Sequence, residues 1–127
     1  MKCSESLHKN VIIGGRTLEI EEVLLAARDA VPVEFSKDQE CHRKIHAGSD
    51  FISQALKEHR EIYGVTTGYG QSGIIAVHPE MMLDLPNNLV RFHGCGMGEI
   101  LSEPLAKAVM VVRLNSLAYG HSGVRMD

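Results

Sequence analysis

The chain contains 127 residues and carries a formal net charge of −3 with neutral histidines. Hydrophobic residues make up 44% and charged residues 23%, which excludes a wholly disordered chain and fits one ordinary domain. The slightly acidic balance and an aromatic content of only 5% argue against nucleic acid or an acidic membrane surface as the main partner.

The N-terminal segment and the cysteines indicate the compartment. The first ten residues contain no apolar run, and the longest apolar stretch, near residues 105–120, is interrupted by Lys107 and Arg113. Neither a secretory signal nor a membrane span is therefore predicted. Cys3, Cys41 and Cys95 are odd in number, and no Cys-x-x-Cys pair occurs. We expect a cytoplasmic protein with reduced thiols and no structural metal.

The first elements of the chain are short. Residues 11–16 read as an extended piece that turns at Gly14 and Gly15. Apolar residues at helical spacing then predict a helix over residues 19–30, which Pro32 prevents from continuing.

A second, longer helix is predicted from the capping-box spacing of Ser36 and Gln39, and apolar residues at helical spacing, the first of them Cys41, continue it to about residue 60. Gly48 is a weak point in it because glycine is a poor helix former. Cys41, His42 and His46 lie on this helix at spacings that zinc ligands use, but no third ligand accompanies them. We interpret them as part of a solvated polar face.

Two glycine-rich loops flank the next helix. Residues 64–73 hold four glycines, which indicates positive φ angles or close approach to another group. A third helix opens at Pro79, is interrupted at Pro86 and resumes through residues 88–93. Gly94, Gly96 and Gly98 form the second loop.

The last helix has the clearest start, with Ser102 as N-cap and Pro104 in the first turn. Residues 105–119 are apolar on nearly every face, which predicts a helix buried on all sides. Gly120 is the expected C-cap.

Two short motifs match functional patterns only in part. Residues 68–73 fit G-x-G-x-x-G, but a helix precedes them and an extended segment follows, which is the reverse of a dinucleotide-binding loop. Residues 120–123 approach a nucleophile elbow, but Val124 stands where the pattern needs glycine. No nucleotide cofactor is predicted.

Two residues stand out as candidates for chemistry. Tyr63 opens the first glycine loop, where it is either a packing residue or, if nearby positive charges or hydrogen bonds stabilise its phenolate, a base. His93 precedes Gly94, Cys95 and Gly96, and no third group orients a Cys-His pair there. A binding role for His93 is favoured over an acid-base role.

Four stretches, in this order and spacing, resemble the aromatic amino acid lyases, the family of histidine, phenylalanine and tyrosine ammonia-lyases and related aminomutases. They are residues 62–70 (IYGVTTGYG), 88–99 (NLVRFHGCGMGE), 102–104 (SEP) and 113–125 (RLNSLAYGHSGVR). The resemblance covers roughly residues 61–125. It implies a mainly α-helical fold, in which residues 1–127 form the incomplete N-terminal domain of an aspartase/fumarase-like helical lyase.

The resemblance also implies a chemistry. In such lyases an Ala-Ser-Gly tripeptide cyclises into a methylidene-imidazolone electrophile, to which the substrate amino group adds. A tyrosine base then removes a β-proton, and ammonia leaves. By position, Tyr63 is the implied base, Gly70 lines the substrate site, and Phe92 with His93 surrounds the aromatic ring. The implied substrate is an aromatic amino acid, with no metal.

His93 bears on the substrate because a site that pairs a polar group discriminates against substrates lacking that group. Tyrosine or histidine is therefore favoured over phenylalanine. The block RFHGCG, with Leu85-Pro86 before it, resembles a bacterial branch associated with aryl-polyene clusters, whose members are often labelled histidine ammonia-lyase but are expected to use tyrosine. Tyrosine is favoured, with histidine ammonia-lyase and tyrosine 2,3-aminomutase as alternatives.

No Ala-Ser-Gly occurs in the 127 residues, and the chain stops before the segment that carries it in the family. We expect a fragment that is inactive alone and that belongs to an enzyme acting as a homotetramer. A non-enzyme alternative is a truncated, non-catalytic domain that pairs with a partner chain, because the apolar last helix would promote association if exposed.

Overall fold

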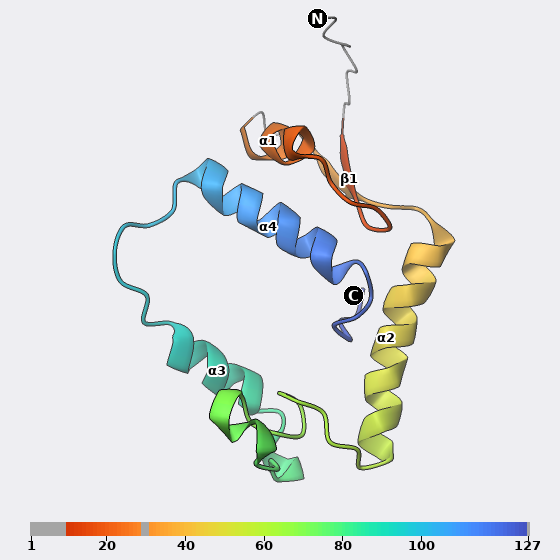
Figure 1. The fold of residues 1–127 in the computed structure, drawn as a ribbon, viewed down its shortest axis with the longest axis vertical. Coiled ribbons are helices and arrows are strands. Elements are labelled where there is room, and N and C mark those ends of the chain that lie inside the picture. Colours follow the sequence, from red (N-terminus) through yellow and green to blue (C-terminus); the bar gives the residue numbers. More distant parts are fainter. Residues whose placement is uncertain (1–9, 29–30, 127) are drawn as a thin grey trace, which may run out of the picture. The chain divides into compact units, whose positions relative to one another are not determined.

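The computed structural model describes residues 10–28 and 31–126; Cys3 and the predicted end of the first helix at residue 30 lie outside them. The described part contains four α-helices, two short strands and two 3-10 helices, which confirms the mainly helical fold (Figure 1). It divides into two compact units, which we call unit 1 (within residues 1–50 and 100–127) and unit 2 (residues 51–99).

Unit 1 begins with two parallel strands that are connected through a helix. Strand β1 (Val11–Ile13) pairs in parallel with β2 (Val33–Phe35), and the crossover between them holds helix α1 (Ile20–Arg28). The extended piece and the turn were predicted, and Gly14 and Gly15 have φ angles of 94° and 77°. Strand β2 was not predicted, although residues 33–35 alternate in polarity directly after a proline.

Helix α4 (Glu103–Leu117) completes unit 1 by packing against α1 and β1 (Figure 1). Val111 of α4 joins Val11, Ile13 and Ala26 in a buried cluster. A second cluster unites Cys41 and Ile45 with Ala118, just beyond the end of α4. Phe35 packs against both clusters, so β2 ties the two parts of the unit 1 core together.

One buried polar side chain links α4 to the first turn of the chain. Asn115 accepts a hydrogen bond from the Gly14 N–H at 2.8 Å and donates one to the Arg16 carbonyl at 3.0 Å. Asn115 is 8% exposed, so both of its polar groups need protein partners. It thereby holds the glycine turn against α4, although Gly14 and Asn115 are 101 positions apart in the chain.

Helix α2 (Gln39–Lys57) starts later than the capping box predicted. Asp38 caps it, because its Oδ1 accepts the Glu40 N–H at 3.1 Å, while Ser36 Oγ accepts the Asp38 N–H instead. A short Asx-type bond across two residues therefore sets the start. Cys41 on the first turn is 2% exposed, which confirms its place among the apolar positions of the helix and contradicts its place on a solvated polar face.

The C-terminus of α2 carries a residue in an unfavourable conformation. His59 has a φ of 53°, the left-handed region, which costs a non-glycine residue about 1 kcal/mol. The Arg60 N–H bonds to the Ala55 carbonyl and the His59 N–H to the Leu56 carbonyl, which is the Schellman pattern with His59 at C′. That position usually belongs to glycine.

Replacing His59 by Gly is expected to raise the free energy of unfolding by about 1 kcal/mol, because glycine adopts this φ without steric cost. Urea unfolding followed by circular dichroism at 222 nm measures the change. The matched control is Glu58→Gly one residue earlier, which gains no such relief. A destabilising effect of His59→Gly would mean that the imidazole makes contacts that outweigh its backbone strain.

Unit 2 contains the glycine loop and the third helix. A 3-10 helix, η1 (Gly70–Ile74), forms inside the loop, and another, η2 (Pro79–Met81), precedes helix α3 (Leu85–His93). The prediction of a helix from Pro79 interrupted at Pro86 was wrong in detail. Pro86 lies in the first turn of α3, where its missing N–H has no helical partner to lose.

The apolar last helix also departs from expectation. Its start at Glu103 with Ser102 as N-cap agrees with the prediction, but α4 ends at Leu117 instead of residue 119. The expected burial on all sides is wrong for the described chain, because Val109 and Met110 are 59% and 62% exposed. The segments packed against α4 within unit 1 cover only part of its surface. None of the described helices combines the length and the hydropathy that a bilayer span requires.

Candidate functional site

The loop that opens at Tyr63 is held in shape by two threonines. Thr66 Oγ1 accepts the Ile62 N–H at 2.7 Å, and Thr67 is 3% exposed. Thr67 and Ala76 form an antiparallel bridge, flanked by a bond from the Val77 N–H to the Thr66 carbonyl at 2.8 Å. These hydrogen bonds join the two ends of the loop and fix its backbone.

The glycines of this loop make room for aromatic rings. A Cβ atom on Gly64 would lie 2.7 Å from Tyr69, and one on Gly73 would lie 2.9 Å from the ring of Tyr63. The rings of Tyr63 and Tyr69 meet edge to face, with centroids 6.2 Å apart. The sequence predicted close approach in this loop, and the two rings are the groups that approach.

The phenol oxygen of Tyr63 accepts a hydrogen bond from the Gly70 N–H at 2.9 Å. Gly70 is the first residue of η1, so its N–H has no partner within that helix, and its φ of 58° favours glycine. An N–H donated to a phenol oxygen stabilises negative charge on that oxygen. Tyr63 is 65% exposed, so the described chain does not enclose this residue.

A cavity of about 460 Å³ lies next to this pair, between the glycine loop and α3. It is lined by Gly68, Tyr69, Gly70, Ser72, Leu85, Asn88, Leu89, Phe92 and His93. Three of the four residues singled out from the sequence therefore line one cavity. The fourth, Tyr63, does not line it but is bonded to Gly70, which does.

His93 presents one ring nitrogen to the surroundings. Its Nδ1 lies 3.0 Å from the Leu89 carbonyl, one helical turn earlier. A carbonyl only accepts, so Nδ1 carries the proton in this contact and Nε2 of the neutral ring carries a lone pair. Phe92 meets the same ring edge to face at 5.6 Å and is 80% exposed. The pair can thus offer an apolar ring face and one hydrogen-bond acceptor.

Other residues of the cavity were not singled out from the sequence. Leu85, Asn88 and Leu89 share one helix face with the predicted Phe92, at the i, i+3, i+4, i+7 spacing, so the signal was present once α3 was known to begin at Leu85. Ser72 and Tyr69 reach the cavity only because η1 turns the loop. Local spacing gives no indication of that turn.

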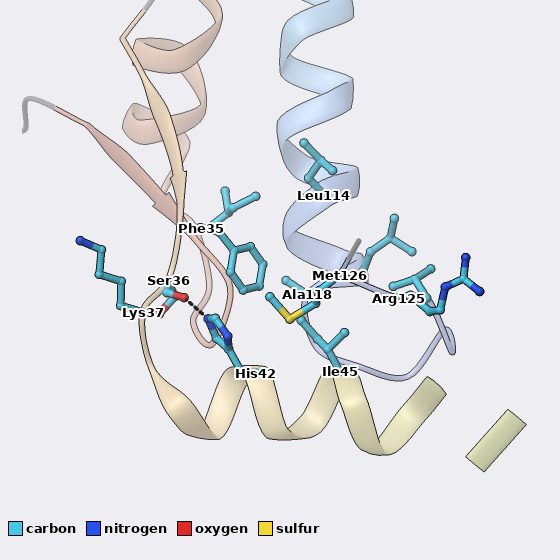
Figure 2. A pocket seen from close by; sticks show the side chains of 12 residues that line it. Phe35, Ser36, Lys37, His42, Ile45, Leu114, Ala118, Arg125 and Met126 are labelled. Carbon is cyan, nitrogen blue, oxygen red and sulfur yellow. Dashed lines mark hydrogen bonds between the residues drawn. The ribbon is translucent and has the colours of Figure 1, made fainter. Parts of the chain in front are cut away.

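A second hollow of about 500 Å³ lies in unit 1 and contains none of the predicted site residues. Figure 2 shows Phe35 and His42 facing Ala118 and Met126 across it. The imidazole of His42 bonds through Nε2 to the Ser36 carbonyl at 2.7 Å and meets the Phe35 ring at 5.3 Å. These contacts occupy His42 in holding β2 against α2.

The group of Cys41, His42 and His46 is not a metal site in this structure. Burial raises the pKa of the Cys41 thiol, whose hydrogen points to the Ala118 carbonyl at 3.5 Å. Among the described residues, no three His, Cys, Asp or Glu side chains are arranged to hold a metal ion. Cys41 serves as a core residue, and the sequence interpretation of a solvated face applies only to His46, which is exposed.

Comparison with known proteins identifies a family whose model matches most of this chain. A family model described as aromatic amino acid lyase matches residues 18–127. A histidine ammonia-lyase from Streptococcus gordonii is 36% identical over 115 residues, which is 91% of this chain and 22% of that enzyme. The chain thus spans about a fifth of the length of the curated relatives it matches.

Solved structures similar to this chain belong to enzymes that act on aromatic amino acids, as their names state. A tyrosine aminomutase from Streptomyces globisporus superposes with a TM-score of 0.83 at 35% identity, over 91% of this chain and 22% of the aminomutase. A histidine ammonia-lyase from Trypanosoma cruzi gives a TM-score of 0.77 at 27% identity, over 92% of this chain and 22% of that enzyme. The residues that the family model matches, 18–127, include the glycine loop and α3.

Proposed function

This chain belongs to the aromatic amino acid lyase family, and we propose that it supplies the base and the ring-binding part of an aromatic amino acid ammonia-lyase. The observation that carries the proposal is the hydrogen bond from the Gly70 N–H to Tyr63 Oη beside a cavity lined by Gly70, Phe92 and His93. It brings a candidate base and a candidate ring site together within unit 2.

In the proposed reaction Tyr63 removes the proton. Its phenolate oxygen takes a proton from the β-carbon of the substrate, and the C–H electrons form the double bond between the α- and β-carbons. The C–N bond breaks, and its electron pair leaves with the amine nitrogen. The hydrogen bond from the Gly70 N–H holds the phenol oxygen in one position for the transfer.

The methylidene-imidazolone of the family would supply the electrophile that makes the substrate amine a leaving group. This chain contains no Ala-Ser-Gly, so its own residues cannot form that group. Turnover therefore requires a further polypeptide segment, and we expect residues 1–127 alone to be inactive. We further propose that the complete enzyme is a cytoplasmic homotetramer, and that this chain contributes the N-terminal domain of each subunit.

Tyrosine is the proposed substrate, and 4-coumarate the product. The lone pair on His93 Nε2 can accept a hydrogen bond from a phenol, whereas phenylalanine would leave that nitrogen without a partner. The imidazole N–H of a histidine substrate can also donate a hydrogen bond to His93 Nε2. The Streptococcus gordonii relative supports histidine as the second candidate. The Streptomyces globisporus relative supports a tyrosine 2,3-aminomutase as the third.

The substrate proposal is tested in a complete enzyme carrying this chain, either native or made by fusing residues 1–127 to the remaining part of the tyrosine aminomutase relative. Tyrosine, histidine and phenylalanine are supplied separately, and ultraviolet absorbance follows the conjugated product. Chromatography detects β-tyrosine, which would indicate the aminomutase. A preference for phenylalanine would contradict the assignment of His93, and a preference for histidine would replace tyrosine by the second candidate.

Replacing His93 by Phe in that enzyme is expected to change the ratio of kcat/KM for tyrosine over phenylalanine by about a hundredfold or more, in favour of phenylalanine. The physical reason is the loss of the only hydrogen-bond acceptor that His93 offers to the ring substituent. Phe92→Leu is the matched control, because it alters apolar contact and should affect both substrates alike. An unchanged ratio in His93→Phe would remove His93 as the residue that distinguishes them.

A further inference from the structure

One side of helix α4 presents an apolar strip with nothing packed against it in the described chain. Leu105, Val109 and Val112 are 57%, 59% and 52% exposed. The strip borders a groove of about 490 Å³. The groove is lined by Ala108, Val109, Val112, Arg113 and Ser116. We call Leu105, Val109, Val112 and Ser116 the α4 seam.

The seam lies away from the side of α4 that unit 1 uses. Val111 and Asn115 are buried, and with Ala118 they follow the next stripe around the helix. That side packs against α1 and β1, and Asn115 bonds to the turn after β1. The seam is therefore exposed because α1 and β1 contact a different side of α4.

The spacing of the seam fits a helix as its partner. Its four residues follow one another at steps of four, three and four, the pattern of a helix that packs nearly parallel or antiparallel to another. The seam runs for about 16 Å at 1.5 Å per residue. Ala108 and Ser116 are small, which lets a second helix approach closely. Arg113 at its edge favours a partner with a carboxylate at that point.

The partner follows from how much of the family's length is present. The chain spans 22% of its relatives, and its fold matches one of them with a TM-score of 0.83. About four fifths of a relative's length therefore lies outside this structure. We propose that the α4 seam docks a helix from that remaining part of an aromatic amino acid lyase, and that this part binds residues 1–127 even when it is supplied as a separate polypeptide.

Association between two polypeptides tests the proposal. The 127-residue chain is mixed with the part of the Streptococcus gordonii histidine ammonia-lyase that follows the region matched here, and affinity is measured by interferometry. The matched N-terminal region of the streptococcal enzyme serves as the positive control. A saturable one-to-one complex is expected. Val109→Asp combined with Val112→Asp is expected to weaken binding by about a hundredfold or more, because two carboxylates would be buried without partners.

The matched control is Ile20→Asp, which places the same charge on an apolar position of α1 that is 75% exposed, and it should leave binding within threefold. Circular dichroism checks that each variant keeps its helices. If the double Asp variant loses helix, Val109→Ala with Val112→Ala replaces it, with an expected weakening of about tenfold.

Three results would overturn the proposal. They are no binding where the positive control binds, binding that the seam variants leave unchanged, and a seam-dependent dimer of the chain alone in sedimentation, which would make a second copy the partner. The proposal rests on family membership and not on the assigned substrate or base. No turnover is measured, so its failure is distinguishable from failure of the lyase proposal.

Discussion

Replacing Tyr63 by Phe in a complete enzyme carrying this chain is expected to lower kcat by about a thousandfold, with little change in stability. The substitution removes only the phenol oxygen that accepts the Gly70 N–H and that we propose takes the β-proton. General-base catalysis by a positioned side chain contributes about 10² to 10⁴ in rate. Initial rates with saturating tyrosine measure the effect, and urea unfolding confirms that the fold is retained.

Tyr69→Phe is the matched control for this prediction. Tyr69 lies in the same loop and meets Tyr63 edge to face, but the ring carries that contact and the hydroxyl does not. Its variant should retain kcat within about threefold. If Tyr63→Phe keeps a tenth or more of the activity, Tyr63 is a packing residue, which is the alternative that the sequence left open.

Replacing Gly48 by Ala is expected to lower the free energy of unfolding by about 3 kcal/mol. A Cβ atom at Gly48 would lie 2.1 Å from the Gly120 carbonyl oxygen, and that oxygen belongs to backbone that cannot move aside cheaply. Gly120 is itself constrained by a φ of 82° and by the Lys44 carbonyl, 2.5 Å from where its own Cβ would stand. Urea unfolding at 222 nm measures the loss.

The sign of this effect separates two physical causes. Helix propensity alone predicts that alanine at Gly48 stabilises α2 by about 1 kcal/mol. Close packing of α2 against the turn after α4 predicts the opposite. His46→Ala, at an exposed position on the same helix, is the control and should change stability by less than 1 kcal/mol. A stabilising Gly48→Ala would show that the Gly120 carbonyl does not approach Gly48 closely.

The candidate site was largely predictable because its parts are local in sequence. Tyr63 and Gly70 are seven positions apart in one loop, and Phe92 and His93 end one helix. What the sequence could not supply is the way η1 turns Ser72 and Tyr69 toward α3. That turn depends on a backbone pairing between Thr67 and Ala76, and no residue type specifies such a pairing by itself.

The elements of the fold were predictable to different degrees. The start of α4 and the glycine turn after β1 are set by capping and by φ preferences, which act within a few residues, and both were predicted. Strand β2 was missed because a three-residue strand carries little periodicity and exists only by pairing with β1. The start of α2 was misplaced because Asp38 competed with Ser36 for the cap.

The sequence by itself determined the mainly helical class, the glycine loop beginning at Tyr63 and the family, because motifs of adjacent residues report short-range constraints. Only the tertiary structure decided which side of α4 is buried, why Gly48 is glycine, and that Asn115 holds the Gly14 turn. These depend on contacts between residues far apart in the chain. A nearly all-round apolar helix is compatible with burial of any face, so only its neighbours select one.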